Sequence, residues 1–165
     1  MKELVVLSGK GGTGKTSLVG CLAALNDRTV LVDCDVDASN LHLILQPEIR
    51  TRYDFIGGKR AHVYPAMCTG CGLCEVSCRF DAMRESDAAG ITAGPTFEVD
   101  SLKCEGCGVC AVVCPEDAIR LEDHVTGRWF ESESEYGPVV HGELGIAEGN
   151  SGKMVSRLRQ RAVEI

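Results

Sequence analysis

Eight cysteines fall within residues 68–114 in two runs of one pattern, and this doubled pattern constrains the chain more than any other feature. Both runs read C-x-G-C-G-x-C-x-x-x-C and are followed by Asp-Ala and an apolar residue. The first run holds Cys68, Cys71, Cys74 and Cys78, and the second holds Cys104, Cys107, Cys110 and Cys114. An internal duplication of this kind predicts one small module with two equivalent metal sites.

The spacing within each run is typical of ligands for a 4Fe-4S cluster. A two-residue loop lets neighbouring thiolates reach adjacent irons, while the fourth cysteine, one helical turn on, reaches the other cluster. The predicted ligands are therefore Cys68, Cys71, Cys74 and Cys114 for one cluster, and Cys104, Cys107, Cys110 and Cys78 for the other. Zinc would require four ligands closed locally, usually as two separated pairs, and would not explain the doubled run.

The rest of the composition sets the context for this module. With 165 residues the chain has room for one ordinary domain or two small ones, and its net charge of −7 argues against nucleic acid as the main partner. The apolar runs are too short for a membrane span, and the N-terminal MKELVVLSGK is too short for a signal peptide. A cytoplasmic protein is expected, and disulfides would conflict with that compartment.

The N-terminal region predicts an α/β unit. The apolar run at 3–8 (ELVVLS) predicts a buried strand, the apolar spacing in 15–25 predicts a helix, and the β-branched run at 29–32 predicts a second strand parallel to the first. Residues 38–46 predict a short helix that ends before Pro47. Cys21 and Cys34, which lie outside the two runs, are expected to be small core residues.

The remaining elements are less regular. Gly57-Gly58 predicts the turn of a hairpin with strands at 53–56 and 61–64, and residues 91–99 predict two short strands around Gly94-Pro95. Residues 136–146 predict a loop and a strand, and a basic amphipathic helix is predicted from Ser151 onward.

A glycine-rich loop between the first strand and the first helix predicts a phosphate site. It fits G-x4-G-K-T and consists of Gly9, Lys10, Gly11, Gly12, Thr13, Gly14, Lys15 and Thr16. Its backbone N–H groups and the helix N-terminus would hold phosphates, Lys15 would neutralise the β- and γ-phosphates, and Thr16 would bind Mg²⁺. The alternative is a glycine-rich turn without a ligand.

Two aspartates follow the second predicted strand. Asp33 and Asp35 come directly at its carboxyl end, which is the ligand side of a parallel sheet. The alternative is an Asp-rich turn that caps the next helix.

The loop sequence SGKGGTGKT, with its early lysine, resembles the superfamily of MinD, ParA and the nitrogenase iron protein. This resemblance implies that the chain binds ATP or ADP with Mg²⁺. It also implies that Lys10 reaches the phosphates of a partner subunit in a nucleotide-bound dimer. By the same resemblance, Asp35 would orient the attacking water and Asp33 would assist near Mg²⁺.

The cysteine module resembles the bacterial two-cluster ferredoxins, with one departure: Arg79 follows Cys78, where that family usually has proline, as Pro115 follows Cys114. The departure removes no ligand, and its expected effect is on solvent access or potential at one cluster. Together the two resemblances imply a P-loop ATPase with an inserted ferredoxin domain. The expected fold is α/β, a partial parallel P-loop sheet at 1–57 and 122–165 with an α+β ferredoxin-like insert at 58–121.

Other elements of that superfamily do not occur in the sequence. It has neither a second acidic strand nor a switch loop of Asp-Gly-Pro-Pro-Gly type. The expectation is a truncated product, a fragment, or half of a split protein, whose partial sheet pairs in a homodimer or with a complementary chain. Whether it hydrolyses ATP stays open.

The leading hypothesis is an ATP-binding iron–sulfur protein in which nucleotide state controls electron transfer to a redox partner protein. The alternatives are a carrier module that binds nucleotide and clusters without hydrolysis, and a plain ferredoxin-type electron carrier.

Overall fold

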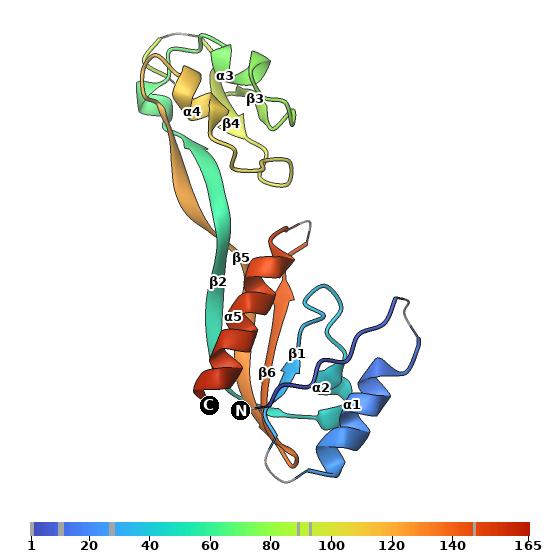
Figure 1. Ribbon diagram of the computed structural model, residues 1–165. Helices are drawn as coiled ribbons and strands as arrows, with labels where there is room; N and C mark the ends of the chain where they lie inside the picture. The colour runs from blue at the N-terminus through green and yellow to red at the C-terminus, as the bar shows by residue number, and fades with distance from the viewer. Residues whose placement is uncertain (1, 10–11, 27–28, 89, 93, 147) are drawn as a thin grey trace. The chain divides into compact units, whose positions relative to one another are not determined.

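The computed structural model describes residues 2–9, 12–26, 29–88, 90–92, 94–146 and 148–165 (Figure 1). The chain divides into two compact units, one formed by Met1–Gly57 with Val125–Ile165 and the other by Gly58–His124. In the part of the chain that is described, no helix is long and apolar enough to cross a membrane.

A four-stranded mixed sheet has the strand order β1-β6-β5-β2. Its strands are β1 (Leu31–Asp33), β6 (Gly137–Leu144), β5 (Ile119–Ser134) and β2 (Glu48–Val63). Strand β1 runs parallel to β6, and β6 runs antiparallel to β5. The two long strands β2 and β5 contribute residues to both units.

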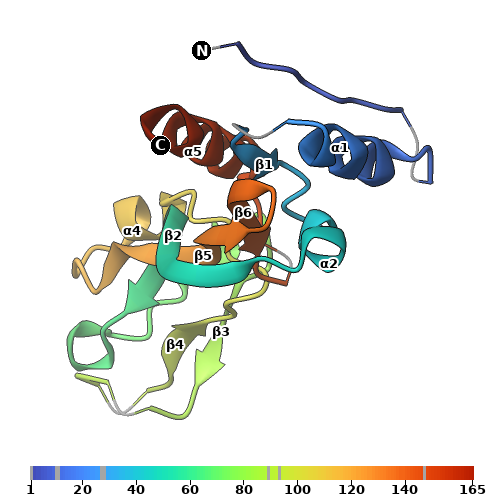
Figure 2. The same ribbon diagram turned by 90° about the horizontal axis from the view of Figure 1, so that it is seen from below.

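In the first unit the sheet is covered on both faces at β6. Its neighbouring residues Val139 and Val140 are both fully buried, and they belong to different apolar cores because successive side chains of a strand point to opposite faces. Val140 packs with helix α5 (Ser151–Glu164), and Val139 packs with helices α1 (Lys15–Ala24) and α2 (Leu41–Leu45). Figure 2 shows α5 and this helix pair on opposite sides of β6.

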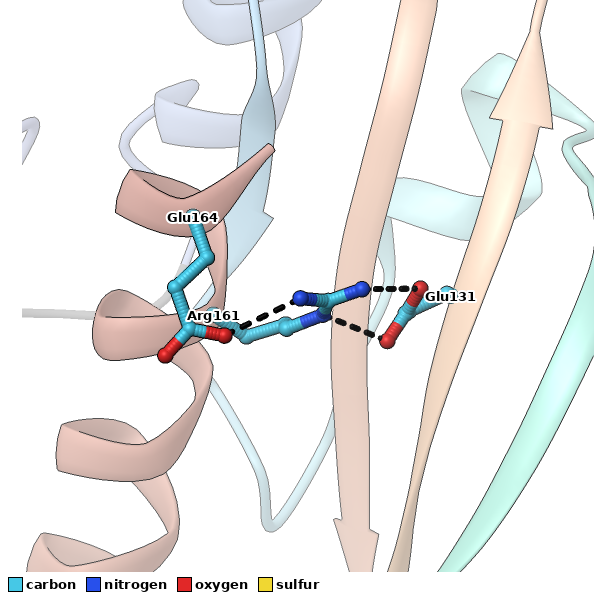
Figure 3. A network of polar contacts seen from close by, with 3 residues as sticks. All are labelled: Glu131, Arg161 and Glu164. Atoms are coloured by element: carbon cyan, nitrogen blue, oxygen red, sulfur yellow. Dashed lines mark hydrogen bonds and ion pairs between the residues drawn. The ribbon is translucent and has the colours of Figure 1, made fainter.

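Helix α5 forms as predicted. Met154, Leu158 and Ala162 recur every four residues and are buried along one stripe against the sheet. Near its end, the Arg161 guanidinium donates from Nε to Glu131 Oε1 at 2.7 Å and from Nη2 to Glu131 Oε2 at 3.2 Å, and it also contacts Glu164 (Figure 3). This two-pronged contact fixes the helix to β5.

The second unit is built around its own apolar core. Strands β3 (Met83–Ser86) and β4 (Thr96–Val99) form an antiparallel pair, and two short helices, α3 (Leu73–Val76) and α4 (Val109–Val113), contact each other. A 3₁₀ turn, η1 (Pro65–Met67), leads into the first cysteine run. Ala61, Val63, Met83, Phe97 and Ile119 fill the core together with several of the cysteines.

The predicted hairpin at Gly57-Gly58 is wrong, because both glycines lie inside the continuous strand β2. A Cβ at Gly57 would overlap the Thr126 hydroxyl and the Phe55 ring. The glycine therefore serves a close approach of side chains across the sheet instead of a turn. The short strand predicted near Ile91 is also wrong, since β3 precedes it at Met83–Ser86.

The predicted buried strand at 3–8 is wrong as well. These residues carry no strand assignment, and Leu4 and Leu7 are 74% and 85% exposed. A buried parallel strand needs hydrogen-bonding neighbours and cover on both faces. Among the described residues, the strand that apolar cores cover on both faces is β6. The segment at 3–8 contacts the rest of the first unit through Glu3, which accepts two hydrogen bonds from the Arg159 guanidinium at 2.9 Å.

The two remaining cysteines also differ from expectation. Cys21 and Cys34 are exposed instead of buried in a core. Helix α1 buries only Ala23 fully, and Cys21 lies on the part of its surface that the described elements leave uncovered.

Candidate functional site

In each cysteine run two glycines precede a short helix and adopt the backbone conformation that leads into it. Gly72 and Gly108 cap the N-termini of α3 and α4 with φ of 77° and 83°. Gly70 and Gly106, two residues earlier, also have positive φ, and a Cβ at either position would overlap a backbone carbonyl. Positive φ at all four positions explains why glycine occupies them.

The structure gathers four cysteines from both runs around one cavity. Cys68, Cys71 and Cys74 come from the first run and Cys114 comes from the second. Phe97, Ala118 and Ile119 are among the apolar residues that complete the lining. These four cysteines are the set that the spacing predicts for one cluster.

The first three thiols of each run lie near one another. Burial raises the pKa of the Cys74 thiol to about 11, with smaller contributions in the same direction from Cys68 and Cys71, against the N–H groups of Glu75 and Cys74. Burial likewise raises the pKa of the Cys110 thiol, and Cys104 and Cys107 add to the effect. Metal binding would have to release these protons, because thiolate is the ligand form.

The fourth cysteine of each run accepts a hydrogen bond from the backbone four residues on. The N–H of Ala82 donates to Cys78 Sγ at 3.3 Å, and the N–H of Ala118 donates to Cys114 Sγ at 3.4 Å. Backbone N–H groups that point at sulfur stabilise the negative charge of a cluster and its thiolates.

The donor set fits an iron–sulfur cluster. Among the described residues, no three His, Cys, Asp or Glu side chains are arranged to hold a single metal ion. In a cubane site each thiolate binds a different iron, so the cysteines surround the cluster instead of meeting at one atom. A cavity lined by four cysteines, with N–H groups directed at sulfur, matches that requirement.

The glycine loop is described in part, because Lys10 and Gly11 lie outside the described residues. Gly12 and Gly14 have φ of 74° and 85°, and space is open around both and around Gly9. Lys15 and Thr16 begin α1 directly after Gly14, and Lys15 Nζ donates to Ser8 Oγ at 3.0 Å. Thr13 is exposed in the turn between the two glycines.

The carboxylate of Asp33 organises its own loop. Oδ1 accepts from the N–H of Asp35 at 3.1 Å, and Oδ2 accepts from Ser39 Oγ at 2.7 Å and from the N–H groups of Asn40 and Leu41 at 3.2 and 3.0 Å. Asp35 is exposed beside it. This geometry corresponds to the alternative reading of an Asp-rich turn before helix α2.

Two further groups lie near these sites without a signal in the sequence. Glu116 lines the cysteine cavity, although it sits in the variable part of the repeat. His141 on β6 is paired in register with Asp33, is buried, and stacks on Phe130 with ring centroids 4.9 Å apart. Strand pairing between distant segments, which brings His141 to Asp33, is not encoded in local spacing.

Comparison with known proteins supports an iron–sulfur domain. Residues 67–118 match the sequence model of a family described as a 4Fe-4S dicluster domain. The match spans both cysteine runs, and it supports 4Fe-4S clusters as the cofactor.

Similar curated proteins fall into two groups. An uncharacterized protein of Methanocaldococcus jannaschii is 33% identical over 163 residues, which is 97% of this chain and 54% of that protein. The septum site-determining protein MinD of Thermotoga maritima is 43% identical over 63 residues, or 34% of this chain and 23% of that protein. MinD of Escherichia coli is 44% identical over 57 residues, or 32% of this chain and 21% of that protein.

The chain thus spans about half the length of the first of these relatives and less than a quarter of the two MinD proteins. Taken together, the matches support an iron–sulfur domain in one chain with a region that is partly similar to MinD.

Proposed function

We propose that this protein is an ATP-binding iron–sulfur electron carrier in which nucleotide state controls electron transfer through two 4Fe-4S clusters. The observation that carries the proposal is the cavity lined by Cys68, Cys71, Cys74 and Cys114, which brings together cysteines from both runs. A bound cluster supplies one-electron chemistry; the protein positions it and tunes its charge.

In this proposal the chain's own residues have separate tasks. The two four-cysteine sets hold the clusters, and the N–H groups of Ala82 and Ala118 stabilise negative charge at sulfur. Gly9 through Thr16 hold the phosphates, with Lys15 as the cation and Thr16 as the Mg²⁺ ligand. Lys10, Asp33 and Asp35 are assigned the roles that the loop's resemblance implies.

The domain assignment belongs to the same proposal. Residues 1–57 and 122–165 form a discontinuous nucleotide-binding domain, and residues 58–121 form the inserted cluster domain. The exposed apolar residues of the N-terminal region, such as Leu4, Leu7 and Leu25, support association with a second copy or a complementary chain.

Iron analysis tests the cluster part. After anaerobic reconstitution we expect about eight irons and eight sulfides per chain, because two cubanes carry four of each. A Cys21→Ala variant is the matched control, since Cys21 lies outside both runs and is exposed. It should retain about eight irons. Zinc in place of iron, or about four irons in the wild-type chain, would contradict the proposal.

Nucleotide control is tested by electron paramagnetic resonance of the reduced, reconstituted chain. Mg-ATP should change the signal or the midpoint potential of the wild type, while Lys15→Ala should respond weakly because it lacks the phosphate-neutralising cation. Lys2→Ala removes an equal charge at an exposed position outside both the loop and the cysteine runs, and it should respond as the wild type does. Identical spectra with and without Mg-ATP in the wild type would reject nucleotide control.

A second candidate is a module that binds nucleotide and clusters without hydrolysis. It is favoured by the Asp33 carboxylate, which already accepts four hydrogen bonds from its own loop and is thus engaged away from the Mg²⁺ role that hydrolysis would give it. ATP turnover by the isolated chain separates the two: phosphate release that Lys15→Ala abolishes supports the first candidate, and binding without release supports the second.

A further inference from the structure

The internal duplication allows the two cluster sites to be compared position by position within one chain. The backbones of the two runs agree closely. Gly70 and Gly106 have φ of 72° and 63°, and Asp81 and Asp117, which precede the alanine shared by both repeats, have φ of 50° and 49°. The N–H to sulfur distances, 3.3 and 3.4 Å, agree as well. Differences between the sites must therefore come mainly from the side chains around them.

The site of Cys68, Cys71, Cys74 and Cys114 is bordered by carboxylates. Glu116, two residues after Cys114, lines the cavity itself. Glu75 directly follows Cys74, where the second run has the neutral Ala111. Negative charge beside a cluster disfavours the added electron of its reduced state and so lowers its reduction potential.

At the site predicted for Cys104, Cys107, Cys110 and Cys78, a cation is the sequence neighbour of two of the ligands. Arg79 directly follows Cys78, and its guanidinium lies 5.6 Å from the centre of the Phe80 ring. Lys103 directly precedes Cys104 and is opposed by Glu105 on the other side of that cysteine. The two positions after the fourth cysteine are Arg79 and Phe80 in the first repeat, and Pro115 and Glu116 in the second. The first repeat therefore places a cation next to Cys78, and the second places an anion near Cys114.

We infer that the two clusters have unequal reduction potentials, and that Arg79 and Glu116 are the positioning residues that separate them. The site of Cys78, Cys104, Cys107 and Cys110 has the higher potential and takes the first electron. The inference rests on the proposed function, since it requires both clusters to bind. The chemistry is transfer of one electron from a low-potential donor to each cluster, and no covalent bond forms or breaks.

The size of the effect follows from exposure. Arg79 and Glu116 are both exposed, so solvent and salt screen their charges. We expect each substitution to change the ratio of reduced to oxidised cluster at a fixed potential by about threefold. Because a tenfold change is 59 mV for a one-electron couple, threefold corresponds to about 28 mV.

The test is a potentiometric titration of the full reconstituted chain, followed by electron paramagnetic resonance with dithionite as reductant. Arg79→Gln should lower the higher potential and leave the lower one in place, and Glu116→Gln should raise the lower potential alone. Arg79→Lys keeps the charge and should match the wild type. The shifts should shrink at high salt, which a purely structural effect would not do.

Three results would overturn the inference. They are equal potentials in the wild type, a shift of the lower potential by Arg79→Gln, and no shift from either neutral variant. Iron content is measured on the same samples. A chain that fails to load about eight irons contradicts the proposed function, whereas a fully loaded chain with unmoved potentials contradicts only this inference.

Discussion

The Asp33 carboxylate is a buried acceptor of several hydrogen bonds in the first unit. It is 9% exposed and accepts four hydrogen bonds, from the backbone of Asp35, Asn40 and Leu41 and from the Ser39 hydroxyl. Buried donors that lose such an acceptor are left without a partner, which costs more than the bond itself contributes. Asp33 therefore holds the loop between β1 and α2 whatever its role toward a nucleotide.

Replacing this carboxylate should destabilise the first unit. For Asp33→Ala we expect the free energy of unfolding to fall by about 3 kcal/mol, because several backbone N–H groups lose their acceptor. The fluorescence of Trp129, the single tryptophan, reports this in a denaturant titration, since Trp129 is buried in the core of the first unit. Asp35→Ala, at an exposed position, should change the stability by less than about 0.5 kcal/mol, and an equal loss in both variants would contradict the account.

His141 should make the same unit sensitive to mild acid. Its pKa is lowered, first by burial and then by His42, against the opposing effects of Asp33 and Glu143. The folded chain thus holds this imidazole neutral at pH values where the unfolded chain protonates it, so stability is full above about pH 6.5 and falls as the pH drops below it.

We expect this loss of stability in unfolding titrations at pH 7.5 and 5.5. In His141→Gln the difference between the two pH values should become smaller, because a neutral amide replaces the titrating ring. His62→Gln removes a histidine of the other unit and is the control. An unchanged pH dependence in His141→Gln would contradict the assignment.

Among the elements, α5 contributes most clearly to the packing of the sheet. Leu158 is fully buried between β6 and the neighbouring aromatic residues of the core. Leu158→Ala should lower the free energy of unfolding by about 3 kcal/mol through lost contacts and a residual cavity. Val163 on the same helix is 66% exposed, so Val163→Ala should leave the free energy of unfolding nearly unchanged in the same titration. Similar losses for the two would show that the helix does not pack as described.

The elements also mark where sequence reasoning works and where it fails. Local patterns predict α1 and α5, because apolar spacing is a local property. The turn predicted at Gly57 is wrong because glycine occurs both in turns and where a neighbouring side chain comes too close for a Cβ. The neighbour here is Thr126, which is distant in sequence, so local sequence cannot tell the two cases apart. The strand predicted at 3–8 is wrong for a related reason, since a strand forms only beside other strands, and a segment's own sequence does not show which strands lie next to it.

At the candidate site, the cysteine spacing predicts which residues gather, because the ligands of each run are close in sequence. The place of Cys114 beside Cys68, Cys71 and Cys74 follows from the repeat and the known geometry of such modules. The presence of Glu116 at the same cavity could not be predicted, since the direction of a side chain depends on tertiary packing that local spacing does not encode.

For the whole molecule, the exposed apolar surface predicts association. Leu4, Leu7, Leu18, Leu25 and Leu43 are all more than half exposed in the N-terminal region of the first unit. Burying such residues is favourable, so we expect dimers or larger species at micromolar concentration in sedimentation velocity. Leu7→Glu should weaken association, while Leu102→Glu, at an exposed leucine of the other unit, should not. A sharply monomeric wild type would contradict the expectation.

The most direct test of the central claim is electron paramagnetic resonance of the reduced chain with single cysteines removed. If ligands are shared between the runs, Cys71→Ala and Cys114→Ala lose the same cluster and leave one common spectrum. Cys78→Ala and Cys107→Ala should then leave a second common spectrum, from the cluster retained in that pair. Spectra that group Cys71→Ala with Cys78→Ala, or the absence of any cluster signal in the wild type, would contradict the account.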